Sequence, residues 1–260
     1  YQIDGIYIDC WGPSGCRTAP CGYQDAAGKT QPVHPIRAYR QIIRRVYTLF
    51  YERRPDPLLM VHMSSEVEMP LLAFTHTILD GEQFSPNQVL DDYLNVLSPD
   101  MFRAEFLGRN MGPVEFFLPE FRGEYATTGT PNLAAYLLLH GIQPWPIWSD
   151  GKAWNTFFEA QDAFGIEQAK FLPYWQSPSW AERPPDLASA YLRDGKALLV
   201  DVNTMDVPGQ ARLTLNLQRL EMKSVSRATD IFTGEALQLE GNVLTIPQER
   251  HQGRVILLEP

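Results

Sequence analysis

Residues 58–84 of the 260-residue chain, LLMVHMSSEVEMPLLAFTHTILDGEQF, decide the fold that we predict. The stretch holds two apolar runs, 58–61 and 75–79, and polar residues follow each run directly. Apolar runs of this length, bounded by polar residues, are typical of strands buried on both faces of a parallel sheet. In α/β barrels and open α/β sheets, functional groups stand where such strands end. The stretch therefore predicts a parallel α/β fold with a site at the carboxyl ends of its strands.

The same pattern extends in both directions from this stretch. Apolar positions recur every three or four residues over 36–54, which predicts an amphipathic helix between a strand at 5–8 and the strand at 58–61. A strand, a helix and a second strand form a βαβ unit with parallel strands. Further strands are predicted at 75–79, 114–118 and 142–147, and further helices from Ser98, at 131–140 and at 155–164. Ser98 has the side chain of an N-cap, and Pro99 follows it at the first helical position.

Five strands are too few to close an eight-stranded barrel. The simplest completion is that three units precede Tyr1, so that the predicted strands are strands four to eight of a (β/α)8 TIM barrel. The fold class that we predict is therefore α/β, a partial barrel over residues 1–180. A five-stranded doubly wound sheet is the alternative, and it requires helices on both faces of the sheet.

The sequence pattern changes after about residue 185. Short runs rich in Val, Leu and Ile at 197–202, 211–217, 224–230, 243–246 and 254–258 are separated by turn signals such as Gly241-Asn242. Strands at this spacing, without helical patterns between them, predict an antiparallel β-sandwich. We place the domain boundary within the proline-rich stretch 177–186, so the sandwich domain would cover residues 186–260.

Composition narrows the classes of partner. The formal net charge of −9 argues against nucleic acid, because phosphate binding draws on clustered Lys and Arg. No run of about 18 apolar residues occurs, so we expect no transmembrane helix and no membrane partner. The chain opens on Tyr1 without a signal peptide, and we expect a secreted or periplasmic protein whose targeting segment lies upstream. The oligomeric state stays open.

The three cysteines, Cys10, Cys16 and Cys21, fall within twelve residues of one predicted loop. One disulfide with a spare thiol, or three free thiols, are both compatible with this spacing. A zinc site is disfavoured because the loop has no C-x-x-C pair and three thiolates would need a fourth ligand.

Carboxyl groups at the predicted strand ends are the candidate catalytic residues. Asp9, Asp80 and Glu82 follow strands that run in the same direction, so their side chains are expected at one rim. Cleavage of a glycosidic bond uses two carboxyl groups, one protonating the leaving oxygen and one acting as nucleophile or activating water. If the strand continued through Gly81, Asp80 and Glu82 would point the same way. The alternative is a turn in which Asp80 caps a helix and Glu82 faces solvent.

Candidate substrate-binding residues lie at the same strand ends. They comprise one imidazole, two further carboxylates and three indoles: His62, Glu66, Glu120, Trp11, Trp145 and Trp148. Indole rings suit the flat faces of sugars, but a large domain also packs its tryptophans into the core. Glu68 and Asp150 are reserve carboxylates. His76 is expected at the opposite end of the barrel with a structural role, and His140 as a favourable charge at a helix C-terminus.

Beyond these physical arguments, a family resemblance is visible. The segments GIYIDCWGP, LLMVHMSSE, THTILDGEQF, FRAEFLGRNMGPVEFFLPE and HGIQPWPIWSD, followed by DGKALLVDVNTM, resemble in order the C-terminal part of barrel proteins grouped with glycoside hydrolase family 123. The resemblance implies a retaining or substrate-assisted glycosidase with an appended β-sandwich. It implies an adjacent Asp and Glu pair, for which the nearest match is Asp80 and Glu82, here separated by Gly81.

A second resemblance is to retaining α-galactosidase-like barrels. It implies a nucleophilic Asp after strand four and an acid/base Asp after strand six, which match Asp9 and Asp80 here. We therefore predict a glycoside hydrolase that acts on a carbohydrate and requires no cofactor and no metal. The rivals are a metal-dependent hydrolase with His62 and Asp150 as ligands, and a non-catalytic carbohydrate-binding relative.

Overall fold

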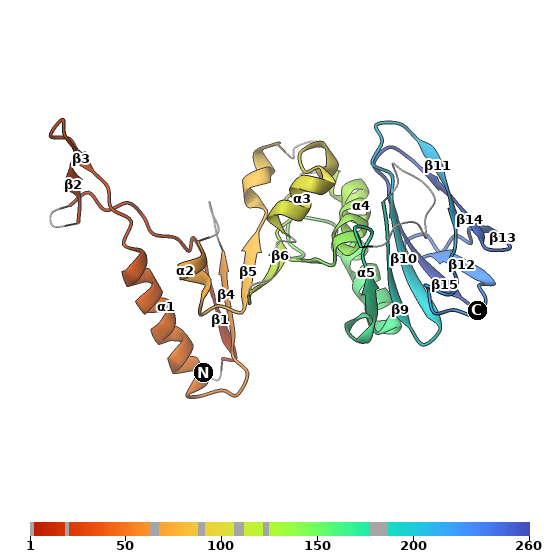
Figure 1. The fold of residues 1–260 in the computed structure, drawn as a ribbon, viewed down its shortest axis with the longest axis horizontal. Coiled ribbons are helices and arrows are strands. Elements are labelled where there is room, and N and C mark those ends of the chain that lie inside the picture. The colour runs from red at the N-terminus through yellow and green to blue at the C-terminus, as the bar shows by residue number, and fades with distance from the viewer. Residues whose placement is uncertain are drawn as a thin grey trace. The chain divides into compact units, whose positions relative to one another are not determined.

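A computed structural model of the chain describes residues 3–18, 21–62, 68–87, 92–106, 112–121, 125–176 and 187–260. The chain forms two compact units (Figure 1). The first unit comprises Tyr1–Gln83 and Arg109–Phe116, and the second comprises Phe84–Gly108 and Phe117–Pro260. The domain boundary predicted at 177–186 lies outside the described residues, so the division into 1–180 and 186–260 stays a prediction.

The predicted strands form a five-stranded sheet in the order β1-β4-β5-β6-β7. Its strands are β1 (Gly5–Ile8), β4 (Leu58–His62), β5 (Thr77–Asp80), β6 (Val114–Phe117) and β7 (Gln143–Pro144). β1 and β4 run parallel with Ile8 opposite Val61, and β4 and β5 run parallel with His62 opposite Leu79. The predicted fold class, part of a (β/α)8 barrel followed by an antiparallel β domain, is confirmed.

The core of the first unit explains why β4 and β5 read as continuous apolar runs. Leu59, Val61 and Ile78 are almost fully buried, and they pack with Ile43 from α1 (Ile36–Tyr51). Other apolar residues of α1 pack against the same cluster, including Tyr39, Val46 and Phe50. Ile42 and Leu49, which the spacing also placed on the apolar face, are exposed, as are the arginines of α1. A short hairpin of β2 (Tyr23–Gln24) and β3 (Thr30–Gln31) precedes α1, and α2 (Met69–Leu72) follows β4. The 3-10 helix η1 (Glu82–Asn87) begins just after β5.

Local capping signals set the helix ends in the second unit. Its helical elements are η2 (Tyr93–Asn95), α3 (Pro99–Glu105), α4 (Tyr125–His140), α5 (Gly151–Phe164) and η3 (Ile166–Gln168). Ser98 caps α3 as predicted, since its Oγ accepts a hydrogen bond from the Met101 amide at 3.3 Å. Gly141 and Gly165 stand at φ values of +76° and +71° and end α4 and α5.

Two helices start earlier than we predicted. α4 begins at Tyr125 and carries Pro131 inside it, although Pro131 was predicted to open the helix. α5 begins at Gly151 because the Asp150 carboxylate accepts the Lys152 amide at 2.8 Å and caps the first turn. β7 is shorter than the predicted strand 142–147, since prolines at 144 and 146 cannot donate ladder hydrogen bonds.

The C-terminal part of the second unit is the predicted antiparallel β domain. One sheet has the order β12-β15-β10-β9-β8 and the other β11-β14-β13. Their strands are β8 (Lys170–Leu172), β9 (Leu187–Arg193), β10 (Lys196–Val202), β11 (Gly209–Thr214), β12 (Arg227–Asp230), β13 (Gln238–Glu240), β14 (Val243–Gln248) and β15 (Gly253–Glu259). β8, β9 and β13 are additions to the strands that we predicted.

β10 is buried on both faces, which accounts for its unbroken apolar run. Leu198 and Val200 belong to the core that contains α4, whereas Leu199 belongs to the core between the two sheets. α4 lies against the sheet of β9, β10 and β15 (Figure 1). The Tyr191 hydroxyl donates to the Leu138 carbonyl at 2.8 Å, and a Cβ on Gly253 would lie 2.4 Å from the Ala135 Cβ. The close approach of α4 therefore requires glycine at position 253.

None of the helices among the described residues is long and apolar enough to span a bilayer. Cys10, Cys16 and Cys21 all have free thiols. Of the alternatives that the sequence left open for these cysteines, the structure therefore has the three free thiols.

Candidate active site

Three of the predicted site residues meet at the carboxyl ends of β1, β4 and β5 in the first unit. The His62 imidazole lies between two carboxylates, with its Nδ1 3.0 Å from Asp9 Oδ1 and its Nε2 3.5 Å from Glu82 Oε2. The parallel register makes this possible, because it brings the ends of β1, β4 and β5 to the same rim. The His62 ring thus separates the Asp9 carboxylate from the Glu82 carboxylate.

The Asp9 carboxylate is held through one of its two oxygens. Asp9 Oδ1 accepts the Cys10 amide at 2.8 Å, contacts His62 Nδ1 at 3.0 Å and accepts the Tyr7 hydroxyl at 3.2 Å. Among the described residues, none donates to Oδ2, and the side chain is 64% exposed. The hydrogen bond from the Cys10 amide, followed by that from His62, lowers the pKa of Asp9. Asp9 is therefore an ionised carboxylate with one anchored and one open oxygen.

The turn after β1 is what aims the Cys10 amide at Asp9. Cys10 has a φ of +49°, in the left-handed region that residues with a Cβ rarely adopt. Such a conformation costs about 1–2 kcal/mol, and strain of this kind gathers at functional sites. The hydrogen bond from Cys10 to Asp9 links that strained turn to the candidate site.

Tyr7 is a site residue that the sequence reasoning missed. Its hydroxyl lies 3.1 Å from His62 Nδ1 and donates to Asp9 at 3.2 Å. Burial, followed by the charge of Asp9, raises the pKa of Tyr7 to about 12, so the phenol keeps its proton and acts as a donor. The sequence could have indicated Tyr7 through its position two residues before Asp9, because alternate residues of a strand share a face.

Asp80 and Glu82 do not point the same way, and the physical reason lies at Gly81. β5 ends at Asp80, Gly81 has a φ of +128°, and Glu82 opens η1. Asp80 is consequently buried, with its Oδ1 accepting the Gly81 amide at 2.9 Å. The Glu82 side chain is 47% exposed and reaches His62. Of the two alternatives that the sequence left open, the structure has the turn, because β5 does not continue through Gly81.

Trp11 lies in the core and not at a sugar-facing surface. It is 6% exposed and packs against Tyr39 with ring centroids 5.3 Å apart, in the cluster that contains Ile43. Its backbone amide donates to the His62 carbonyl at 2.8 Å. The stacking role predicted for Trp11 is therefore wrong, because protein atoms cover its ring.

Glu120, Trp145 and Trp148 belong to the second unit, where they follow β6 and β7. The Trp148 carbonyl accepts the Phe121 amide at 2.8 Å, and the Trp148 side chain is exposed. The Trp145 amide donates to Phe117, and the Glu120 amide donates to the Tyr93 hydroxyl. Their predicted roles in substrate binding stay predictions. Glu66 lies outside the described residues.

The second ligand of the metal alternative, Asp150, has a structural role in the second unit. Its Oδ1 accepts the Lys152 and Ala153 amides and caps α5. Within the described ranges, no group of three or more His, Cys, Asp or Glu side chains is arranged to hold a metal ion.

Two further histidines have structural surroundings. His76 Nδ1 accepts the Leu59 amide at 2.9 Å, and its Nε2 contacts the Tyr51 hydroxyl. His140 is fully buried, and burial lowers its pKa to about 4. The prediction that His140 acts as a charge at the end of α4 is wrong, because burial keeps the imidazole neutral at pH 7.

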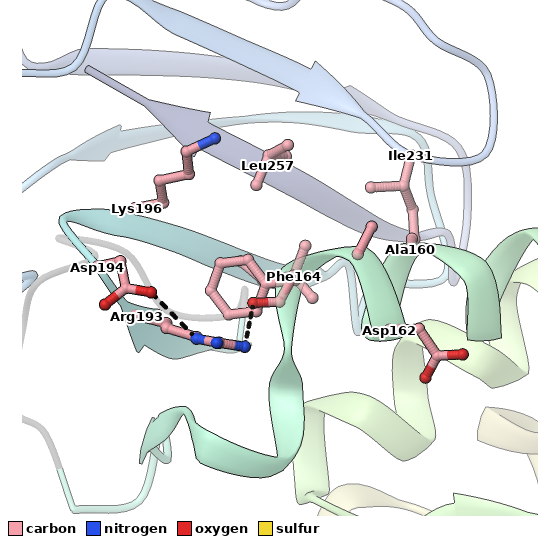
Figure 2. Close-up of a pocket in the computed structure, with 10 residues that line it drawn as sticks. Ala160, Asp162, Phe164, Arg193, Asp194, Lys196, Ile231 and Leu257 are labelled. Carbon is pink, nitrogen blue, oxygen red and sulfur yellow. Dashed lines mark hydrogen bonds and ion pairs between the residues drawn. The ribbon is translucent and has the colours of Figure 1, made fainter.

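A separate groove of about 510 Å³ lies in the second unit, between the end of α5 and the sheet of β9, β10 and β15 (Figure 2). Apolar side chains including Phe164, Leu198 and Leu257 line it. The basic side chains at its edge are used within the protein: Arg193 bonds Asp194 and the Phe164 carbonyl, and Lys196 bonds Glu259. None of the predicted site residues lines this groove, so we place the candidate site at Asp9, His62 and Glu82.

Comparisons with known proteins extend the fold assignment. No protein-family model matches the chain, and no curated protein matches it in sequence. Among solved structures, the chain is similar to a glycoside hydrolase family 27 β-L-arabinopyranosidase from Geobacillus stearothermophilus, with 12% identity and a TM-score of 0.57 over 99% of this chain and 58% of that one. It is also similar to an α-amylase from Lactobacillus plantarum, with 9% identity and a TM-score of 0.54 over 96% of this chain and 77% of that one.

These similarities show the fold. The chain spans 58% of the length of the arabinopyranosidase. The similar structures are glycoside hydrolases, which bears out the coarser part of the predicted resemblance; membership of family 123 itself stays a prediction. A variant of the arabinopyranosidase was solved in complex with arabinose.

Proposed function

We propose that the chain carries part of a glycoside hydrolase active site, with Asp9 as the ionised carboxylate that faces the sugar and Glu82 as the proton donor. The observation that carries this proposal is the asymmetry of Asp9. Three groups contact its Oδ1, whereas none of the described residues donates to Oδ2, and the side chain is 64% exposed. A carboxylate that must meet a developing positive charge requires this combination of a fixed position and a free oxygen.

The chemistry follows from the two environments. Asp9, ionised because donors surround its Oδ1, would attack the anomeric carbon or stabilise its positive charge as the bond to the leaving oxygen breaks. Glu82, on the other side of His62, would give its proton to that leaving oxygen, so that the alcohol departs neutral. Water then completes the hydrolysis and returns the proton to the site. Asp80, buried beside the Gly81 amide, would hold the turn that presents Glu82.

Similarity of fold to glycoside hydrolases supports the proposal, as does the position of the site at the carboxyl ends of parallel strands. The substrate would be a carbohydrate bound without a cofactor. Export to the periplasm or the medium remains our expectation for a protein acting on such a substrate.

Substitution of the two carboxylates tests the proposal. The full-length protein would be assayed against a panel of alkyl glycosides, whose leaving oxygen needs a proton, and the anomer of the product followed by NMR. Asp9→Asn removes the charge but keeps the shape, and Glu82→Gln removes the proton donor. Loss of a general acid typically lowers the rate by about 10²–10⁴-fold, and we expect a loss of at least this size for both variants.

The matched control is Asp4→Asn. Asp4 belongs to the same unit, its side chain is 84% exposed, and it forms an ion pair with Arg54. We expect this variant to retain full activity. Undiminished hydrolysis by Asp9→Asn would overturn the assignment of Asp9. A wild-type protein that binds sugars without cleaving any glycoside would instead favour the non-catalytic relative.

A further inference from the structure

The two nitrogens of the His62 ring have different surroundings. His62 is 5% exposed, and its Nδ1 is engaged by Asp9 at 3.0 Å and by the Tyr7 hydroxyl at 3.1 Å. Its Nε2 is buried and has no hydrogen-bond partner within the part of the chain that the structure describes. The polar atom that faces it is Glu82 Oε2 at 3.5 Å, which is an ion-pair contact. A buried, unsatisfied ring nitrogen therefore faces the proposed proton donor.

The two contacts of the His62 ring together require a second proton. The 3.0 Å contact with Asp9 places one proton on Nδ1, because the neutral tautomer with its proton on Nε2 would set the Nδ1 lone pair against Asp9 Oδ1. If His62 were neutral with its proton on Nδ1, toward Asp9, the Nε2 lone pair would face a Glu82 oxygen that also carries lone pairs. Two acceptors repel each other. The contact becomes attractive when one proton lies on Nε2, giving an imidazolium beside a carboxylate, or on Glu82, giving a carboxylic acid beside the ring. In both forms, the His62–Glu82 pair carries one proton more than neutral His62 beside a Glu82 carboxylate.

We propose that His62 and Glu82 hold this proton jointly and that it is the proton delivered to the leaving oxygen. This inference rests on the proposed function and adds a role for His62 that differs from holding a substrate hydroxyl. As the bond between the anomeric carbon and the leaving oxygen breaks, the oxygen takes the proton. The His62–Glu82 pair is left as neutral imidazole and carboxylate. The attacking water later supplies the proton that restores the pair.

The groups around His62 favour this arrangement. Asp9 faces Nδ1 from the end of β1, and its negative charge stabilises a positive imidazolium. Tyr7 faces the ring from β1 and keeps its own proton, so it does not compete for the shared one. Asp80 follows Leu79, the register partner of His62, at the end of β5, and its Oδ1 accepts the Gly81 amide. Contacts that are long in a free enzyme commonly shorten when substrate binds.

Two substitutions of His62 separate a proton-holding role from a structural one. His62→Asn carries its amide nitrogen near the position of Nδ1, so it retains a donor toward Asp9 and lacks any group toward Glu82. His62→Gln reaches toward Glu82 and loses the donor toward Asp9. Neither amide holds an additional proton. A purely structural role, which is to hold Asp9, would leave His62→Asn active and impair only His62→Gln.

The assay compares leaving groups. With alkyl glycosides, whose leaving oxygen needs a proton, we expect both variants to lose about 100-fold or more in kcat/KM. With dinitrophenyl glycosides, whose leaving oxygen needs none, His62→Asn should change little. The basic limb of its pH–rate profile on alkyl glycosides should move to lower pH. Equal losses on both substrates, no loss on either, or an unmoved basic limb would each overturn the proposal.

A second measurement is independent of activity. Nitrogen-15 NMR of histidine-labelled full-length protein follows the protonation of the His62 ring with pH. Glu82→Gln cannot share a proton, so we expect the titration of His62 to move to lower pH in this variant. Glu52→Gln, an exposed residue at the end of α1, is the matched control and should leave the titration unchanged. If Glu82→Gln leaves it unchanged too, the shared proton is refuted, whether or not the protein cleaves glycosides.

Discussion

The buried His140 makes the stability of the second unit depend on pH. His140 ends α4 with no solvent exposure, donates from Nδ1 to the Tyr136 carbonyl at 2.8 Å and accepts from the Tyr174 hydroxyl at 3.2 Å. Burial lowers its pKa from 6.5 to about 4. The unfolded chain therefore binds a proton as the pH falls below 6.5, and the folded protein does not until about pH 4. The stability that the neutral, buried His140 contributes is therefore complete above about pH 6.5 and is lost as the pH falls to about 4.

The magnitude follows from the same two values. Each unit of pKa difference corresponds to about 1.4 kcal/mol, so lowering the pH from 7 to 4 should cost about 3 kcal/mol through His140. His140→Gln removes the titrating group and should lower stability at pH 7 while flattening its dependence on pH. The difference in unfolding free energy between wild type and variant should therefore shrink by about 3 kcal/mol over this range.

Urea unfolding at a series of pH values, followed by tryptophan fluorescence, measures this difference. Five of the six tryptophans lie in the second unit, so the signal reports mainly on the unit that contains His140. His34→Gln, which changes an exposed histidine of the first unit, is the matched control and should leave the pH dependence as in wild type. Parallel pH curves for wild type and His140→Gln would refute the reasoning.

Three further substitutions, one of them with a matched control, test the local structure. Ser98→Ala removes the cap of α3 and should lower the free energy of unfolding by about 1 kcal/mol in a urea titration; an unchanged midpoint would contradict the cap. Gly165→Ala should lower the free energy of unfolding by about 2 kcal/mol, because φ is +71° and the new Cβ would lie 1.0 Å from Arg193 Nη1. Its control is Gly151→Ala, where the new Cβ has open space around it, and this variant should leave the melting temperature almost unchanged. Trp11→Phe should destabilise the first unit by about 1–2 kcal/mol without altering KM for a glycoside, and a raised KM would instead show contact with substrate.

The order of helices and strands was predictable because buried positions recur at a regular spacing and carry apolar residues. Leu59 and Val61 read as a buried strand, and α1 reads as an amphipathic helix, since each element packs its apolar residues against one core. Strand direction then placed Asp9, His62 and Glu82 at one rim, where the structure brings them together. These inferences needed only the period of the apolar residues and the rule that parallel strands end at the same edge.

The details that were misassigned or left open depend on tertiary surroundings. The orientation of Asp80 depends on where β5 stops, and the positive φ of Gly81 sets that point. The charge of His140 depends on an aromatic enclosure that includes Phe102 and Trp175, which are distant in sequence. Burial of Trp11 depends on Tyr39 lying opposite it. A residue type at a strand or helix end does not reveal which groups from elsewhere in the chain will surround it.

The single anchored oxygen of Asp9 has a consequence for covalent labelling. Three contacts hold Oδ1, so we expect an electrophile to be captured through the lone pairs of Oδ2. Reagents such as cyclitol epoxides should therefore esterify Asp9 when their reactive carbon approaches from the solvent side. Tight steric selection among stereoisomers of the reagent is the expected signature.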